Sequence, residues 1–234
     1  MKKLFLLLLT TFLFADVKVA TAGNAAFAIQ ALVKVFYEKT HIKVTPIIGS
    51  SGKLAAQIEN GAPYDVYLSA NMAYPEYLFK KNLTITKPVV YAKGKLVLFA
   101  KNGVKSIKDL LNATKIAIAN PKTAPYGALA IDYLRDQNLY DKLKDKFVIA
   151  PNIAAALNYA MRATNYAFIA KSLIFKLPKK YQNKNHYIEL DDFYERTSQG
   201  AVLLKDREEA RKFFLFLFSP QAKEIFKRYG YDVN

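Results

Sequence analysis

The feature that most constrains this chain's fold is a recurring order of segments: a strand-like stretch, a short small or polar loop, then a helix-like stretch. Residues 17–20 alternate as a half-buried strand, residues 21–24 read Thr-Ala-Gly-Asn, and residues 25–39 place apolar side chains three and four positions apart, as on one helix face. The order recurs over residues 41–60, where residues 49–52 read Gly-Ser-Ser-Gly. This alternation is typical of an α/β architecture.

The second half of the chain repeats the pattern. Further strand-like stretches lie at residues 95–100, 115–119, 147–150, 166–170 and 201–204, and two helices split at Ser219-Pro220 close the chain. A strand, a polar loop and a helix in that order expose helix N-terminal amides, which attract anions, at the carboxyl edge of a parallel sheet. Two such units predict a two-lobed binding protein with its ligand in the cleft between the lobes.

The lobe boundaries follow from where the chain crosses between the two units. The first crossing is expected at residues 92–95 and the return near residues 197–200. We therefore predict a first lobe of residues 16–91 plus 201–234 and a second lobe of residues 92–200.

The N-terminus has the form of a secretory signal peptide. Lys2 and Lys3 precede an apolar run that is too short to span a bilayer, and Ala15 closes the segment before Asp16. We expect residues 1–15 to be removed and the mature chain to work outside the cytoplasm; a buried N-terminal helix or an uncleaved anchor is the alternative. The chain contains no cysteine, which excludes disulfides and thiolate metal sites and leaves no residue for lipid attachment at the cleavage point.

The charge of the chain is strongly basic, with 35 Lys and Arg against 19 Asp and Glu and a net charge of +16. The lysines are scattered singly or in pairs, and the longest cluster, at residues 178–180, is short. This distribution indicates a solvated basic surface that helps to collect small anions, and no nucleic-acid partner is expected.

Several motifs resemble one known family. Residues 49–54 read Gly-Ser-Ser-Gly-Lys-Leu, and residues 57–70 read Gln-Ile-Glu-Asn-Gly-Ala-Pro-Tyr-Asp-Val-Tyr-Leu-Ser-Ala. Together with Asn120-Pro121, Pro125-Tyr126-Gly127 and the closing residues 219–231, they resemble the molybdate-binding periplasmic proteins of ABC importers over nearly the whole mature chain.

The resemblance implies a type II periplasmic binding fold, in which each lobe is a central sheet flanked by helices. It also implies a monomer in the periplasm that uses no cofactor, catalyses no reaction, and delivers a tetrahedral oxyanion to an ABC permease in the inner membrane.

The resemblance also implies a set of binding residues. Members of the family hold the anion with two serine hydroxyls and their amides, two further backbone amides and a tyrosine hydroxyl. The corresponding positions of this chain are, in that order, Asn24, Ser51, Tyr126, Ile153 and Ala170. Because Ala170 has no side-chain donor, the neighbouring Lys171 is the candidate to supply a cation in its place.

The expected ligand is molybdate, tungstate or both, held by hydrogen bonds without direct coordination of the metal by the protein. These anions are fully deprotonated at neutral pH, so all their oxygens accept hydrogen bonds, and a site of N–H and O–H donors suits them. Phosphate carries a proton at that pH and favours a site with one acceptor. The candidate loops contain no carboxylate, which argues weakly against phosphate.

Other interpretations remain open at this stage. Ser50 and Ser51 could simply cap a helix, Asn24 could be a turn residue, and Lys171 could be a solvated surface lysine. The chain could bind another anion or serve as an adhesin on the same fold. An enzyme is not expected, because neither a Gly-x-Ser-x-Gly elbow nor a glycine-rich dinucleotide motif occurs.

Overall fold

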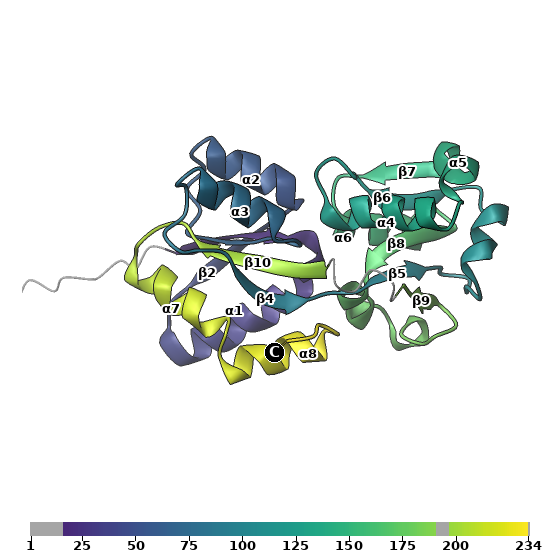
Figure 1. Cartoon of the computed structure of the whole chain (residues 1–234). Helices are drawn as coiled ribbons and strands as arrows, with labels where there is room; N and C mark the ends of the chain where they lie inside the picture. Colours follow the sequence, from purple (N-terminus) through teal and green to yellow (C-terminus); the bar gives the residue numbers. More distant parts are fainter. Residues whose placement is uncertain (1–15, 191–196, 234) are drawn as a thin grey trace, which may run out of the picture.

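The computed structural model describes residues 16–190 and 197–233, and the predicted signal peptide lies outside these residues. The chain forms two α/β bodies side by side, which Figure 1 shows at the left and right. Within the described residues, no helix is both long and apolar enough to cross a membrane.

The first body contains a five-stranded sheet in the order β2-β1-β3-β10-β4. Its strands are β1 (Val17–Ala22), β2 (Val44–Gly49), β3 (Val66–Leu68), β4 (Val89–Lys93) and β10 (Ser198–Leu203). The first three strands are parallel, and β10 pairs antiparallel with both β3 and β4. Parallel pairing aligns the carboxyl ends of β1, β2 and β3 at one edge of the sheet, from which the loops that follow them leave.

The second body repeats this arrangement in the order β7-β6-β8-β5-β9. Its strands are β5 (Leu96–Phe99), β6 (Ile116–Ala119), β7 (Phe147–Ala150), β8 (Tyr166–Ala170) and β9 (Tyr187–Glu189). Strand β6 pairs parallel with β7 and β8, and β5 pairs antiparallel with β8 and β9. The predicted lobe boundaries stay a prediction; in the structure β4 extends to Lys93 and β10 begins at Ser198.

Helices cover both faces of the first sheet. They are α1 (Ala26–Thr40), α2 (Ser51–Glu59), α3 (Ala73–Lys80), α7 (Glu208–Phe216) and α8 (Pro220–Arg228). In Figure 1, α2 and α3 lie on one face and α1, α7 and α8 on the other. The C-terminal helices divide as the sequence predicts, because Pro220 begins α8 and the Ser219 side chain accepts a hydrogen bond from the Ala222 amide.

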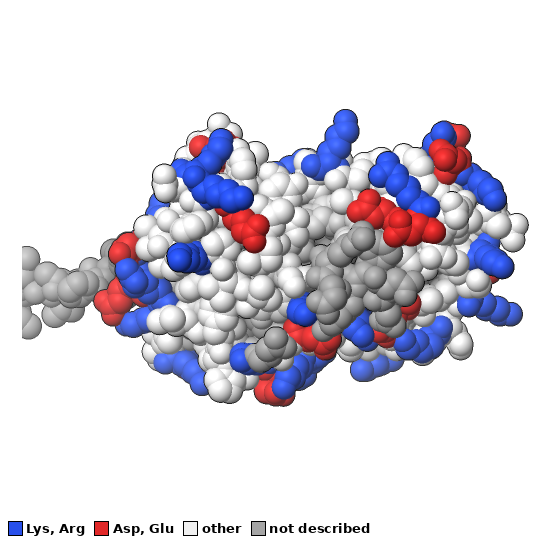
Figure 2. Space-filling view, in the orientation of Figure 1, with Lys and Arg blue, Asp and Glu red and all other residues white. Residues whose placement is uncertain are grey.

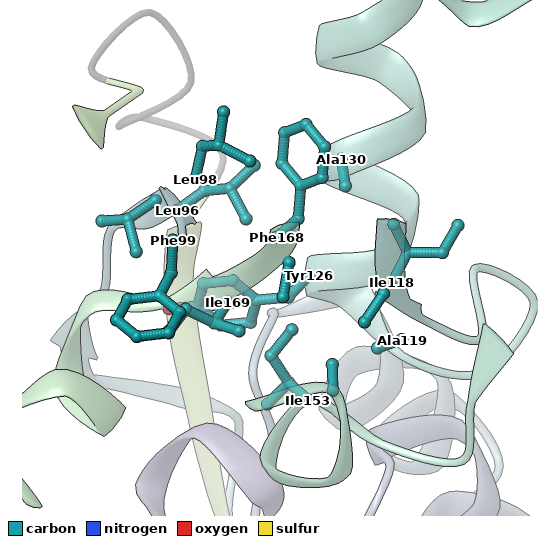
Figure 3. Close-up of a cluster of buried hydrophobic side chains, with 14 of the residues drawn as sticks. Leu96, Leu98, Phe99, Ile118, Ala119, Tyr126, Ala130, Ile153, Phe168 and Ile169 are labelled. Carbon is teal, nitrogen blue, oxygen red and sulfur yellow. The ribbon is translucent and has the colours of Figure 1, made fainter. Parts of the chain in front are cut away.

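The second body carries α4 (Pro125–Asp136), α5 (Tyr140–Leu143) and α6 (Ile153–Arg162). The described residues also form short 3₁₀ helices. In the first body, η1 (Gly23–Ala25) lies between β1 and α1; in the second body they are η2 (Ile107–Asn112), η3 (Lys144–Lys146), η4 (Lys171–Lys176) and η5 (Lys179–Tyr181). The core around this sheet is one cluster of apolar side chains, of which Leu98, Phe99 and Phe168 are fully buried (Figure 3).

The first strand differs from the half-buried strand that the sequence predicts. Val17 and Val19 pack in the cluster with α1 and α7, whereas Ala20 packs in the cluster with α2 and α3. Only Lys18 of β1 is exposed. The strand is covered on both sides because helices pack on both faces of its sheet, as is usual for parallel strands.

Candidate functional site

A small cavity lies where loops of the two bodies meet. Its volume is about 10 Å³, which is about the space that one water molecule needs and far below the roughly 300–1,000 Å³ of sites for drug-sized molecules. Its lining residues are Ala22, Gly23, Asn24, Gly49, Ser50, Ser51, Ala70, Ala124, Pro125, Tyr126 and Ile153. None of these described lining residues carries a charge.

Three helix N-termini meet at this cavity, because α2, α4 and α6 each begin where a strand of a parallel pair ends. Ser51 is the first residue of α2, Tyr126 the second of α4 and Ile153 the first of α6. Amides in the first turn of a helix have no intrahelical partner. The N-terminal end of a helix also carries partial positive charge, so the arrangement favours an anion.

Ser51 supplies a side-chain hydroxyl from the first body. It is fully buried, and its Oγ accepts a hydrogen bond from the Ala70 amide at 3.0 Å. The described hydrogen bonds include none that Ser51 Oγ donates, so its proton is available to a ligand. Its carbonyl oxygen is fixed by the Tyr67 hydroxyl at 2.8 Å.

The side chains of this serine pair do not cap helix α2. Ser50 occupies the N-cap position of α2 but makes no side-chain cap bond. Instead, Ser50 Oγ donates to Thr123 Oγ1 of the second body at 3.2 Å, and the Gly52 amide donates to the Thr123 carbonyl at 2.8 Å. These two bonds join the bodies beside the cavity.

Asn24, in η1, is a further polar residue of the first body that lines the cavity. It is 1% exposed, and its Nδ2 donates to Gln199 Oε1 at 2.8 Å and to the Tyr231 hydroxyl at 3.0 Å. Its carbonyl oxygen accepts from the hydroxyls of Ser172 and Tyr231. Asn24 is therefore held by side chains far along the sequence and is not simply a turn residue.

Tyr126 and Ile153 line the cavity from the second body. Their side chains belong to the hydrophobic cluster of that body (Figure 3), so what they offer a ligand is their backbone amides. Burial raises the pKa of the Tyr126 hydroxyl well above its usual value, so it stays neutral, and it accepts a hydrogen bond from Gln199 Nε2 at 3.2 Å.

Lys171 does not lie among the lining residues of the cavity. Its ammonium pairs with Glu189 Oε1 at 2.9 Å. Burial alone would raise the pKa of Glu189, but hydrogen bonds and charge from Lys171 and Lys184 outweigh burial and hold that pKa at about 2. The ion pair joins Lys171 to Glu189 of β9, and the expectation that Lys171 supplies a cation to the site stays a prediction.

The structure thus brings Asn24, Ser51, Tyr126 and Ile153 to one cavity, and their role in binding stays a prediction. Sequence reasoning missed Gln199 and Tyr231, which contact Asn24 across 175 and 207 positions of the chain. Local pattern carries no signal for such distant partners. One exception is Gly94, a local signal for Gln199, because a side chain at that position would collide with the Tyr126 hydroxyl and with Gln199.

Chemically, the cavity offers hydrogen-bond donors without ionic charge. The basic side chains lie elsewhere: on the face in Figure 2 they are spread over both bodies, with acidic ones among them. A fully deprotonated oxyanion, which accepts at every oxygen, matches such donors.

Comparisons with known proteins agree with this chemistry. The family model described as bacterial extracellular solute-binding protein matches residues 17–232. The molybdate-binding protein ModA of Azotobacter vinelandii is 37% identical over 230 residues, which cover 94% of this chain and 91% of that protein. ModA of Rhodobacter capsulatus is 33% identical over 228 residues, with 92% and 88% covered. The solved structure of the periplasmic molybdate-binding protein of A. vinelandii matches with a TM-score of 0.86 at 31% identity, covering 94% of this chain and 100% of that chain.

Proposed function

Because the chain belongs to the bacterial extracellular solute-binding proteins, we propose that it captures molybdate outside the cytoplasm and delivers it to an ABC permease. Its likeness to two molybdate-binding proteins over more than nine-tenths of its length supports this ligand. The role is binding and transfer, without catalysis or a cofactor. Cleavage of residues 1–15 would leave a periplasmic monomer.

The observation that carries the ligand is the donor set of the cavity. The Ser51 hydroxyl keeps its proton free, and the described hydrogen bonds include none from the first-turn amides of Ser51, Tyr126 and Ile153. Molybdate accepts hydrogen bonds at all four oxygens and donates none, so it uses these groups without leaving an acceptor unmatched. Tungstate has the same charge and nearly the same size, and it should bind in the same place.

The bound anion would contact both bodies at once. Asn24 and Ser51 approach it from the first body, and the amides of Tyr126 and Ile153 from the second. A ligand that contacts both bodies stabilises the arrangement in which they meet. This stabilisation would add to that from the hydrogen bonds that join Thr123 to Ser50 and Gly52.

Calorimetric titration of the mature protein with molybdate, tungstate, sulfate and phosphate tests this function. We expect molybdate and tungstate to bind with similar affinity, and phosphate to bind far more weakly because it brings a proton that needs an acceptor. Molybdate should also raise the melting temperature, by an amount that grows with the logarithm of its concentration over Kd. A protein that binds phosphate better than molybdate, or that ignores all four anions as an adhesin would, contradicts the proposal.

A further inference from the structure

Behind the cavity, two carboxamides and three tyrosine hydroxyls form a buried network. Gln199 Oε1 accepts from Asn24 Nδ2 at 2.8 Å and from the Tyr91 hydroxyl at 2.7 Å, and Gln199 Nε2 donates to the Tyr126 hydroxyl at 3.2 Å. The Tyr231 hydroxyl accepts from Asn24 Nδ2 at 3.0 Å. Gln199 is fully buried, and it lies on β10 beside a register shift that follows it in the pairing with β4.

One atom of this network has no partner. With Asn24 Nδ2 turned to Gln199 and Tyr231, the remaining atom of the carboxamide is Oδ1, which is buried and makes no hydrogen bond. Asn24 lines the cavity, so the free end of its carboxamide is an acceptor beside the proposed anion site. An acceptor repels the oxygens of a deprotonated oxyanion, so this orientation does not suit molybdate.

Reversing both carboxamides together removes this conflict. The oxygen and nitrogen of an amide occupy nearly the same volume, so both orientations fit the same space. Gln199 would then donate from Nε2 to Asn24 Oδ1 and to the Tyr91 hydroxyl, over the same separations of 2.8 and 2.7 Å. The Tyr126 hydroxyl would donate to Gln199 Oε1. The Tyr231 hydroxyl would turn its proton from the Asn24 carbonyl, which keeps its bond from Ser172, to Asn24 Oδ1, and Asn24 Nδ2 would become free to donate to the anion.

We propose that Gln199 is a positioning residue that sets which end of the Asn24 carboxamide faces the oxyanion. With a deprotonated anion bound, Gln199 donates to Asn24 Oδ1 and thereby directs the two N–H groups of Asn24 at the ligand. This inference rests on the proposed function and assigns to it a residue that does not line the cavity.

The neighbours of Gln199 allow both orientations. Tyrosine hydroxyls donate or accept equally well, so Tyr91 and Tyr126 can exchange roles when the amide reverses. Burial raises the pKa of both hydroxyls well above its usual value, so they keep the protons that this exchange requires. A carboxylate at position 199 could only accept, and it would hold Asn24 in the orientation that opposes the anion.

A double-mutant cycle tests the proposal. Gln199→Met removes the amide at similar length, and Asn24→Ser replaces the carboxamide with a hydroxyl that can rotate to donate without help from Gln199. We expect Gln199→Met to weaken molybdate binding by about tenfold when residue 24 is Asn and by less than about twofold when it is Ser, a coupling within the range found for contacting residues. Gln57→Met is the control: the side chain of this exposed glutamine of α2 hydrogen-bonds only Tyr64 among the described contacts, and its substitution should leave the molybdate affinity unchanged.

Gln199→Glu is the second variant, used in the same two backgrounds in case Gln199→Met fails to fold. It keeps the volume and the accepting oxygen, and its charge acts on the anion in both backgrounds, so the charge effect cancels in the cycle. The proposal is supported if Gln199→Glu lowers the molybdate affinity by about tenfold more when residue 24 is Asn than when it is Ser.

Equal losses in both backgrounds would overturn the proposal, because Gln199 would then act on the fold or on the anion directly. If the unsubstituted protein binds molybdate but shows no coupling, only this inference fails. If it binds none of the four anions, the proposed function fails, and the inference fails because it rests on that function.

Discussion

The two bodies contribute to the cavity in different ways. The first body brings the polar side chains of Asn24 and Ser51. A hydrogen bond to Gln199 holds Asn24, and a hydrogen bond from the Ala70 amide holds Ser51. The second body brings Tyr126 and Ile153, whose side chains are committed to the hydrophobic core and whose amides alone can reach a ligand. The first body therefore sets which chemical groups face the anion, and the second provides donors that depend on backbone position.

This difference predicts that side-chain substitutions at Asn24 and Ser51 change affinity, whereas a substitution at Ile153 changes affinity only when it removes the amide. Substitutions at Asn24, Ser51 and Ile153, and at Lys171 outside the cavity, can break or sharpen this contrast.

Asn24→Asp should have the largest effect. It places a carboxylate beside a dianion, and two unit charges 4 Å apart repel by about 4 kcal/mol at an effective dielectric constant of 20, which is roughly a thousandfold in Kd. Titration with molybdate measures the loss. The control is Asn60→Asp at the exposed C-cap of α2, which should leave the affinity unchanged. Tight molybdate binding by the Asn24→Asp variant would show that Asn24 does not face the ligand.

Ser51→Ala should weaken molybdate binding by about tenfold to a hundredfold, because it removes a charge-assisted hydrogen bond of about 1.5–3 kcal/mol. It also leaves the Ala70 amide without its acceptor, so the free energy of unfolding should fall by about 1–3 kcal/mol.

Ser69→Ala is the matched control for Ser51, because Ser69 is also fully buried but hydrogen-bonds Asn71 and does not line the cavity. Denaturant unfolding of this control should show a loss of stability, whereas its molybdate affinity should stay within about twofold. Equal affinity for the Ser51→Ala variant and the unsubstituted protein would defeat the assignment of Ser51.

Ile153 allows the amide and the side chain to be separated. Ile153 begins α6 and follows Asn152 in an extended conformation, so proline fits there without breaking the helix. Proline removes the N–H and also shortens the buried side chain, an effect that Ile153→Val reports without loss of the N–H. Ile153→Pro should weaken binding by about tenfold. Ile153→Val should keep the affinity within about twofold while costing about 0.5–1.5 kcal/mol of stability. Titration and denaturant unfolding of both variants check the pair, and the opposite ranking in affinity would contradict a purely backbone role.

Lys171→Ala should have the smallest effect on binding, with affinity and its salt dependence unchanged, because Lys171 is paired with Glu189 outside the cavity. Its effect should appear in stability against pH. A carboxyl whose pKa falls on folding stabilises the protein above its usual pKa, and this contribution is lost as the pH drops. For Glu189 the loss should run from pH 4.5 to about 2, and Lys171→Ala should reduce it. A salt-dependent loss of affinity would restore Lys171 to the site.

Much of the fold could be predicted from the sequence because its signals are local. The apolar spacing that predicts a helix over residues 25–39 corresponds to α1, and Ser219-Pro220 marks the start of α8. The edge strands β4 and β9 were not predicted. Their residues are partly exposed. Strand β4 pairs antiparallel with β10 and β9 with β5, which lie far from them in the sequence, so no local pattern identifies either strand.

The candidate site divides in the same way. Asn24 and Ser51 follow strands in loops of small residues, and their positions could be inferred from the family resemblance. Gln199 could not, because it lies within β10 and meets Asn24 only through the folded sheet. The ion pair of Lys171 could not be predicted for a similar reason: its partner, Glu189, belongs to the unpredicted strand β9.

A crystal structure of the mature protein with tungstate bound tests the central claim most directly, because the heavy atom locates the anion without ambiguity. The anion should lie in the cavity, with its oxygens about 2.7–3.2 Å from Ser51 Oγ, the Asn24 side-chain nitrogen and the amides of Tyr126 and Ile153. An anion held elsewhere, or held in the cavity by a lysine in place of these neutral donors, would contradict the account.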